Sequence, residues 1–134
     1  MSEKVESKLK HLEFIQQIIT RMNVNSFLLR GWSVTLVSAL FAFATKDSNI
    51  EYILITYIST PLFWVLDGYY LSQERKFRNL YKKVSLLEND KIDFSMKTTN
   101  TNENSWVSSI LSKTEIIFYG TLIGITLIVM FIIN

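Results

Sequence analysis

Residues 116–133 read IIFYGTLIGITLIVMFII, a run of 18 positions without a charged side chain that ends one residue before the last position, Asn134. A helix of about 20 such residues spans the hydrocarbon core of a bilayer, which is about 30 Å thick. The run therefore predicts a transmembrane helix over residues 113–134. Two further apolar stretches lie upstream, at residues 24–45 and 50–71. We therefore expect an all-α integral membrane protein with three transmembrane helices.

The composition fits a chain divided between lipid and water. Of its 134 residues 49% are hydrophobic and 19% are charged, whereas soluble domains carry about 25% charged residues. The chain has no cysteine and one histidine, which excludes disulfides, thiolate metal sites and histidine-rich metal centres. It also lacks a phosphate-binding loop and a serine nucleophile motif. We therefore expect no catalytic residues, no cofactor and no bound metal.

A polar turn at residues 46–49 separates the first two predicted spans, so these spans should form an antiparallel hairpin. Apolar residues continue at helical spacing beyond the membrane, in the amphipathic segment 1–23 and again over 72–88. The two extensions are expected to pack together as a cytoplasmic helical pair. Two alternatives remain open. The N-terminal helix could instead lie on the anionic membrane surface, and Asn25 or Ser26 could cap a break between it and the first span.

Residues 89–112 are rich in Asn, Thr, Ser and Asp, and they predict a flexible cytoplasmic loop with an interfacial stretch at its end. The only histidine, His11, has no charged constellation around it in the sequence. We expect it to be a solvated helix residue. Trp32 and Trp106 are expected at the membrane–water interface, where indole rings are enriched.

The Lys and Arg residues determine the predicted orientation. Of the 14, five precede Gly31, one lies in the turn after the first span, eight lie between the second and third spans, and none follows the third. Since cytoplasmic segments carry the excess of positive charge, the N-terminus should be cytoplasmic and the C-terminus should lie outside a bacterial inner membrane. The same rule, together with anionic lipid, explains the juxtamembrane cluster without nucleic-acid binding; its members are Arg75, Lys76, Arg78, Lys82 and Lys83.

Two charged residues lie inside predicted spans at similar depth. Asp67 is about 6 Å inside the inner end of the second span, and Arg30 is about 4.5 Å inside the start of the first. A charge in the membrane is costly and usually finds a partner. An Arg30–Asp67 ion pair is therefore predicted. It would either lock the register of the hairpin or form a polar constriction or proton-sensitive latch in a pore.

Gly120 and Gly124 form a GxxxG pair in the third span. Glycines at this spacing let two helix backbones approach closely in a membrane. The partner helix could belong to the hairpin of the same chain or to a second copy of the protein. We expect a homo-oligomer in the lipid bilayer.

The stretch RMNVNSFLLRGWSVTLVSAL at residues 21–40, with FWVLDGYYL at 63–71 and QER at 73–75, resembles a family of small uncharacterised bacterial multi-pass inner-membrane proteins. The resemblance covers about residues 10–88 and implies no activity. In general build the chain also resembles membrane effectors of anti-phage systems, which oligomerise and perturb the inner membrane.

Four functions are compatible with these features. The first is an oligomeric, membrane-perturbing or channel-like effector, and the second is a membrane anchor or accessory subunit that docks a cytoplasmic protein partner. A phage-type lysis protein comes third, because such proteins are usually shorter and lack so long a cytoplasmic insertion. A lipid-modifying enzyme comes last, because no catalytic constellation can be named.

Overall fold

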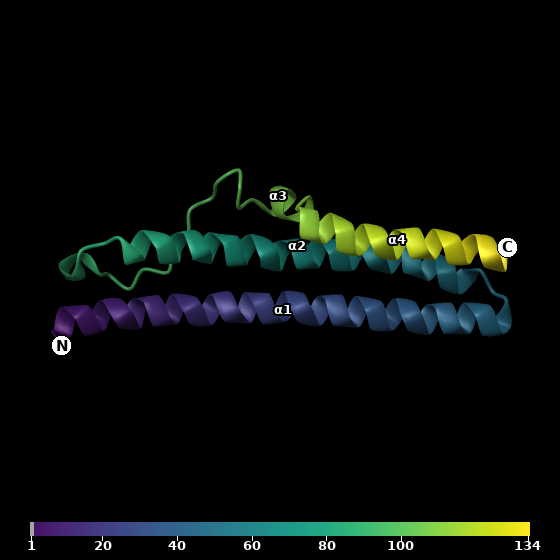
Figure 1. Ribbon diagram of the computed structural model, residues 1–134, viewed down its shortest axis with the longest axis horizontal. Coiled ribbons are helices and arrows are strands. Elements are labelled where there is room, and N and C mark those ends of the chain that lie inside the picture. The colour runs from purple at the N-terminus through teal and green to yellow at the C-terminus, as the bar shows by residue number, and fades with distance from the viewer. Residues whose placement is uncertain (1) are drawn as a thin grey trace.

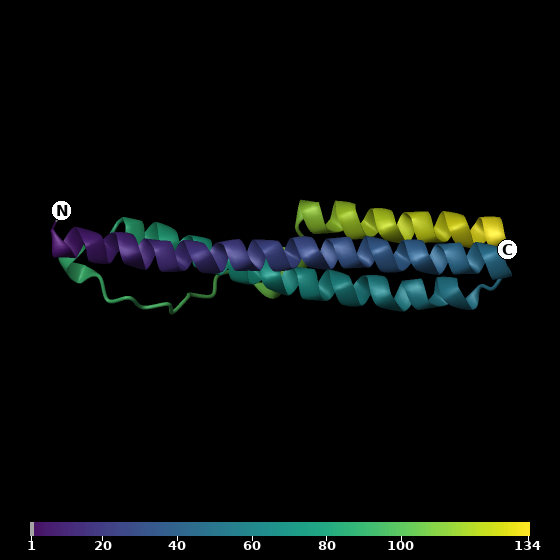
Figure 2. The same cartoon turned by 90° about the horizontal axis from the view of Figure 1, so that it is seen from below.

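The computed structural model describes residues 2–134, and every regular element in that range is helical. The two longest helices, α1 and α2, lie side by side and run in opposite directions (Figure 1), while α4 covers only the half of this pair that contains the α1–α2 turn (Figure 2). The all-helical prediction is confirmed. The elements are α1 (Glu3–Asp47), α2 (Glu51–Ser85), the 3₁₀ turn η1 (Asn89–Lys91), α3 (Trp106–Ile110) and α4 (Lys113–Ile133).

The first helix is continuous over 45 residues. Ser2 caps its start by accepting a hydrogen bond from the Val5 amide, and Ser48 ends it in a left-handed conformation with φ 50°. The predicted alternative of a break at Asn25 or Ser26 is wrong, because both residues lie within the helix. At 1.5 Å per residue α1 is about 68 Å long. It is therefore about twice as long as the hydrocarbon core is thick.

The second helix is also continuous and passes through Pro61 without interruption. It ends at Ser85, three residues before the predicted end of the cytoplasmic extension. A proline in a helix interior leaves one backbone carbonyl without its usual partner. α2 nevertheless continues past Pro61, and it packs against α1.

The helices enclose two separate hydrophobic cores. One lies near the N-terminus of α1 and contains Ile15, Ile19, Leu80 and Val84. The other lies in the half that includes α4, and its buried residues are Val37, Tyr119 and Leu122, packed by Phe41, Phe63, Trp64 and Phe118. Charged and hydroxyl side chains occupy the region between these two cores.

The segment after α2 packs against the helices more closely than its composition predicts. The solvated position expected for His11 is wrong, since its side chain is fully buried. Its Nε2 atom lies 2.9 Å from the Ser95 carbonyl oxygen, and its ring contacts that of Phe94 at 5.4 Å between centroids. Lys8 donates a second bond, 2.8 Å long, to the Leu87 carbonyl. These contacts fasten residues 87–95 to the start of α1.

Two helices, α1 and α4, contain a stretch long and apolar enough to cross a membrane. Only 22% of that stretch in α1 and 17% of it in α4 is buried inside the protein. Most of their apolar side chains thus face outward, as in a protein surrounded by lipid rather than water. Both helices are compatible with a membrane location. The central part of α2 is less apolar, because it includes Pro61, Asp67 and several hydroxyl residues.

Candidate functional site

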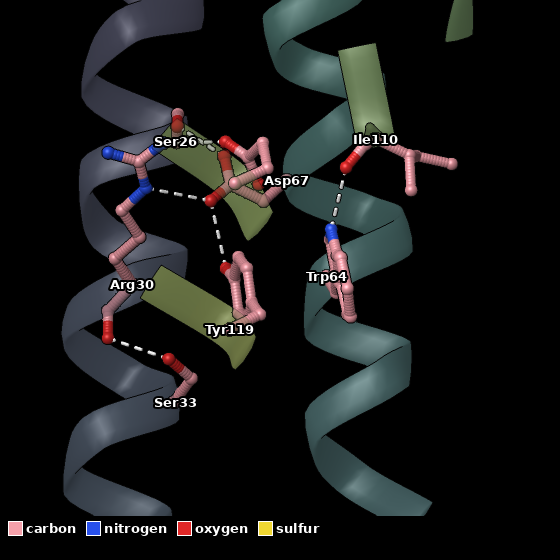
Figure 3. Close-up of polar contacts among 8 residues, drawn as sticks. Ser26, Arg30, Ser33, Trp64, Asp67, Ile110 and Tyr119 are labelled. Carbon is pink, nitrogen blue, oxygen red and sulfur yellow. Dashed lines mark hydrogen bonds and ion pairs between the residues drawn. The ribbon is translucent and has the colours of Figure 1, made fainter. Parts of the chain in front are cut away.

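Asp67 is the centre of a buried polar cluster formed by three helices (Figure 3). Its side chain is fully buried on α2. The Arg30 Nε atom donates to one carboxylate oxygen, Oδ2, at 2.9 Å, and the Tyr119 hydroxyl donates to the same oxygen at 2.8 Å. The Ser26 hydroxyl donates to the other oxygen, Oδ1. Arg30 and Asp67 therefore form an ion pair, as the sequence predicts, and two hydroxyls complete the coordination of the carboxylate.

Glu115 supplies a second carboxylate to this cluster, which the predicted Arg30–Asp67 pair does not include. Its Oε1 atom lies 2.5 Å from Nη2 of Arg30, and its side chain is fully buried. Its other oxygen, Oε2, has no hydrogen-bond partner among the described residues. A signal for it exists in the sequence, since Glu115 is an acidic residue within the predicted third span. We call Ser26, Arg30, Asp67, Glu115 and Tyr119 the charge cluster.

The spacing of the cluster residues along α1 and α4 explains why they meet at one place. Ser26 and Arg30 are four positions apart on α1, and Glu115 and Tyr119 are four positions apart on α4. Residues at this spacing lie on the same face of a helix. Each pair therefore points toward Asp67 on α2. The guanidinium plane also lies over the Phe118 ring, with 5.6 Å between the carbon Cζ and the ring centroid.

The cluster contains one cation and two acidic side chains. When both acids are ionised its formal charge is −1, and the two carboxylates that carry the excess are fully buried. An uncompensated buried charge costs several kcal/mol. Protonation of one carboxyl or separation of α4 would remove this excess. The arrangement is therefore suited to holding or transferring a proton and to changing how α4 packs.

Next to the charge cluster, α3 is fastened across α2 by two indole rings. Trp64 donates from Nε1 to the Ile110 carbonyl at 2.8 Å (Figure 3), and Trp106 donates to the Val65 carbonyl at 2.9 Å. Gly68 lies under α3, where an added Cβ would come within 2.4 Å of Ile110 Cγ1. The position of α3 thus depends on this glycine.

The other predicted site residues lie outside the cluster. Gly120 and Gly124 have no heavy atom of residues 2–134 within 4 Å of a Cβ built on them, so no other helix packs closely against α4 at these two positions. Trp32 is 65% exposed on α1. Two members of the basic cluster have partners: Arg75 donates to the Glu103 carbonyl in the segment after α2, and Arg78 pairs with Glu74 at 2.7 Å within α2. Lys82 and Lys83 are exposed.

Within residues 2–134 no group of three or more His, Cys, Asp or Glu side chains is arranged to hold a metal ion. No protein-family model matches the chain, and comparisons with curated proteins and with solved structures found no match.

Proposed function

We propose that this protein is a small oligomeric inner-membrane effector that perturbs the membrane or forms a channel, with the charge cluster as its latch. The observation that carries the proposal is the unbalanced burial of Glu115, whose Oε2 atom has no partner. An ion pair that served only to fix helix register would need one acid for one base. The second acid destabilises the closed state, in which α4 packs against α1 and α2. This is expected of a conformational switch and not of a purely structural ion pair.

The proposal places three spans in the membrane. α1 and α4 supply the two most apolar stretches. The remaining span is the part of α2 that lies beside the apolar stretch of α1. The N-terminus is cytoplasmic and the C-terminus outside, as the placement of Lys and Arg indicates. The halves of α1 and α2 that enclose Ile15 and Leu80 then form a cytoplasmic stalk, through which a signal reaches the latch.

Opening of the latch separates α4 from the α1–α2 pair. Ser26, Arg30 and Asp67 would then lose Glu115 and Tyr119, and their polar groups would need water or a neighbouring subunit. Several open copies could place these groups around an aqueous path. The open space beside Gly120 and Gly124 leaves room for a second copy to approach α4 closely.

Dye leakage from liposomes tests the latch. In the Glu115→Gln variant the excess charge is gone while a hydrogen bond to Arg30 remains possible, so leakage should fall at least severalfold relative to the unmodified protein. The matched control is Glu51→Gln, which neutralises an exposed carboxylate at the α1–α2 turn and should leave leakage unchanged. Equal leakage from the unmodified protein and Glu115→Gln would contradict the latch.

The second candidate function is a membrane anchor or accessory subunit. It is favoured by the cytoplasmic stalk, which has its own buried core and exposes Leu9 and Phe14 on α1. An anchor predicts a soluble protein that copurifies through the stalk and liposomes that remain tight in every variant, including Arg30→Gln. A role in anti-phage defence rests on the resemblance in general build alone.

A further inference from the structure

A groove with a volume of about 490 Å³ lies between Arg30 of α1 and the first turns of α4. Lys113 and Thr114 line it at the start of α4, and Ile117, Phe118 and Leu122 form its apolar wall. Lys113 and Leu122 are nine residues apart, which corresponds to about 13 Å along a helix. One end of the groove is therefore basic, and the remainder is an apolar surface that runs along α4.

The basic end of the groove exposes two cationic side chains, whereas the neighbouring carboxylates are buried. Lys113 takes part in no ion pair within residues 2–134, and the Arg30 side chain is 27% exposed. Arg30 uses Nε for Asp67 and Nη2 for Glu115, which leaves Nη1 for another acceptor. Both carboxylates are fully buried, so they lie behind the guanidinium group and not in the groove.

The start of α4 adds to this positive potential. Ser112 occupies the N-cap position, but its side chain accepts no hydrogen bond from the first turn. The first N–H groups of a helix have no partner within the helix, and together they carry about half a positive charge. In α4 these groups lie beside Lys113, at the basic end of the groove.

We infer that this groove binds an anionic phospholipid from the cytoplasmic leaflet. The phosphate would lie between Lys113 and Arg30, and one acyl chain would follow Ile117, Phe118 and Leu122. The sign of the exposed charge and the order of basic end and apolar wall match a phospholipid at that leaflet. The inference relies on the proposed membrane placement of α1 and α4, but it does not require channel activity.

Native mass spectrometry of the detergent-purified protein tests the inference by counting retained lipids. Phosphatidylglycerol should be retained in preference to phosphatidylcholine, which has the same phosphate but no net charge, and inorganic phosphate should not displace it. Lys113→Ala should reduce retention of phosphatidylglycerol about fivefold, since one lysine near a lipid surface contributes about 1 kcal/mol. The matched control is Lys82→Ala, which removes an exposed cytoplasmic lysine outside the groove and should retain the lipid as before.

Thr121 also lines the groove, so a second variant, Thr121→Trp, fills the groove without changing charge and should also release the lipid. Thr121 is exposed, so its replacement leaves the protein folded, which helical circular dichroism checks. Unchanged phosphatidylglycerol retention in both Lys113→Ala and Thr121→Trp would overturn the inference. Because retention is measured without a leakage assay, its loss or persistence is independent of whether the protein opens a pore.

Discussion

Arg30 is the residue on which the three long helices depend most. It lies on α1, and its guanidinium bonds Asp67 on α2 and Glu115 on α4. The pair expected from the sequence, Arg30 with Asp67, is thus one side of a three-way junction. This alters the expected effects of mutation, since removal of Asp67 leaves Arg30 with Glu115, whereas removal of Arg30 leaves two buried acids facing each other.

The Arg30→Gln variant should therefore be the least stable single change in the charge cluster. We expect it to lose about 3 kcal/mol or more, because a buried acid without its partner costs about 3–5 kcal/mol. Asp67→Asn should lose less, since the Arg30–Glu115 bond persists. Thermal unfolding in detergent measures both. A larger loss in Asp67→Asn than in Arg30→Gln would contradict the three-way junction.

Gly68 provides a second test at the residue scale. The Gly68→Ala change should displace α3, because the new Cβ would come within 2.4 Å of an Ile110 side-chain atom and 3.2 Å of its Cα. The Trp106 indole would then lose its bond to the Val65 carbonyl, and tryptophan fluorescence should change. Gly120→Ala is the matched control, since nothing lies within 4 Å of a Cβ there. The same spectrum in both variants would rule out close packing of α3 on Gly68.

Among the elements, α1 departs most from a simple membrane span. Its single uninterrupted helix joins the stalk to the apolar half and contains Ser26 and Arg30 of the charge cluster. The segment that follows α2 reinforces the stalk through His11 and Lys8. Its polar composition alone predicts a loose loop, because composition does not reveal which backbone carbonyls receive bonds from a distant helix.

The contact of His11 with Ser95 predicts a protease effect. In His11→Ala the segment at residues 92–97 should loosen, and trypsin should cleave after Lys97 several times faster than in the unmodified protein. Glu13→Ala, an exposed change two positions away on the same helix, is the control and should leave the rate unchanged. Equal cleavage rates in all three proteins would mean that His11 does not hold this segment.

The whole molecule is an elongated helical bundle with two cores and a charge cluster between them. Its apolar exterior around α4 and its basic, polar stalk divide it along its length into a part suited to lipid and a part suited to water. The charge cluster lies near that boundary, where charged side chains are buried at a cost in free energy. The charge cluster thus lies where the apolar part of the molecule meets the polar part.

The three-span arrangement is tested by reporter fusions. A reporter that is active only outside the cytoplasm should be active after Asn134 and inactive when inserted after Asn102, because three crossings place these points on opposite sides of the membrane. A cytoplasmic reporter should give the reverse pattern. Cytoplasmic activity after Asn134 would require two or four crossings and would exclude the proposed topology.

The sequence by itself determines the helical class, the apolar segments and the partnership of Arg30 with Asp67. These follow from local periodicity, from hydropathy and from the cost of an unpaired charge in lipid, all of which depend on short stretches of chain. Only the tertiary structure brings Glu115 and Tyr119 to Asp67 and folds Ser95 onto His11. The residues of each such contact are separated by tens of positions in the sequence. They meet only because segments distant in the sequence pack against each other.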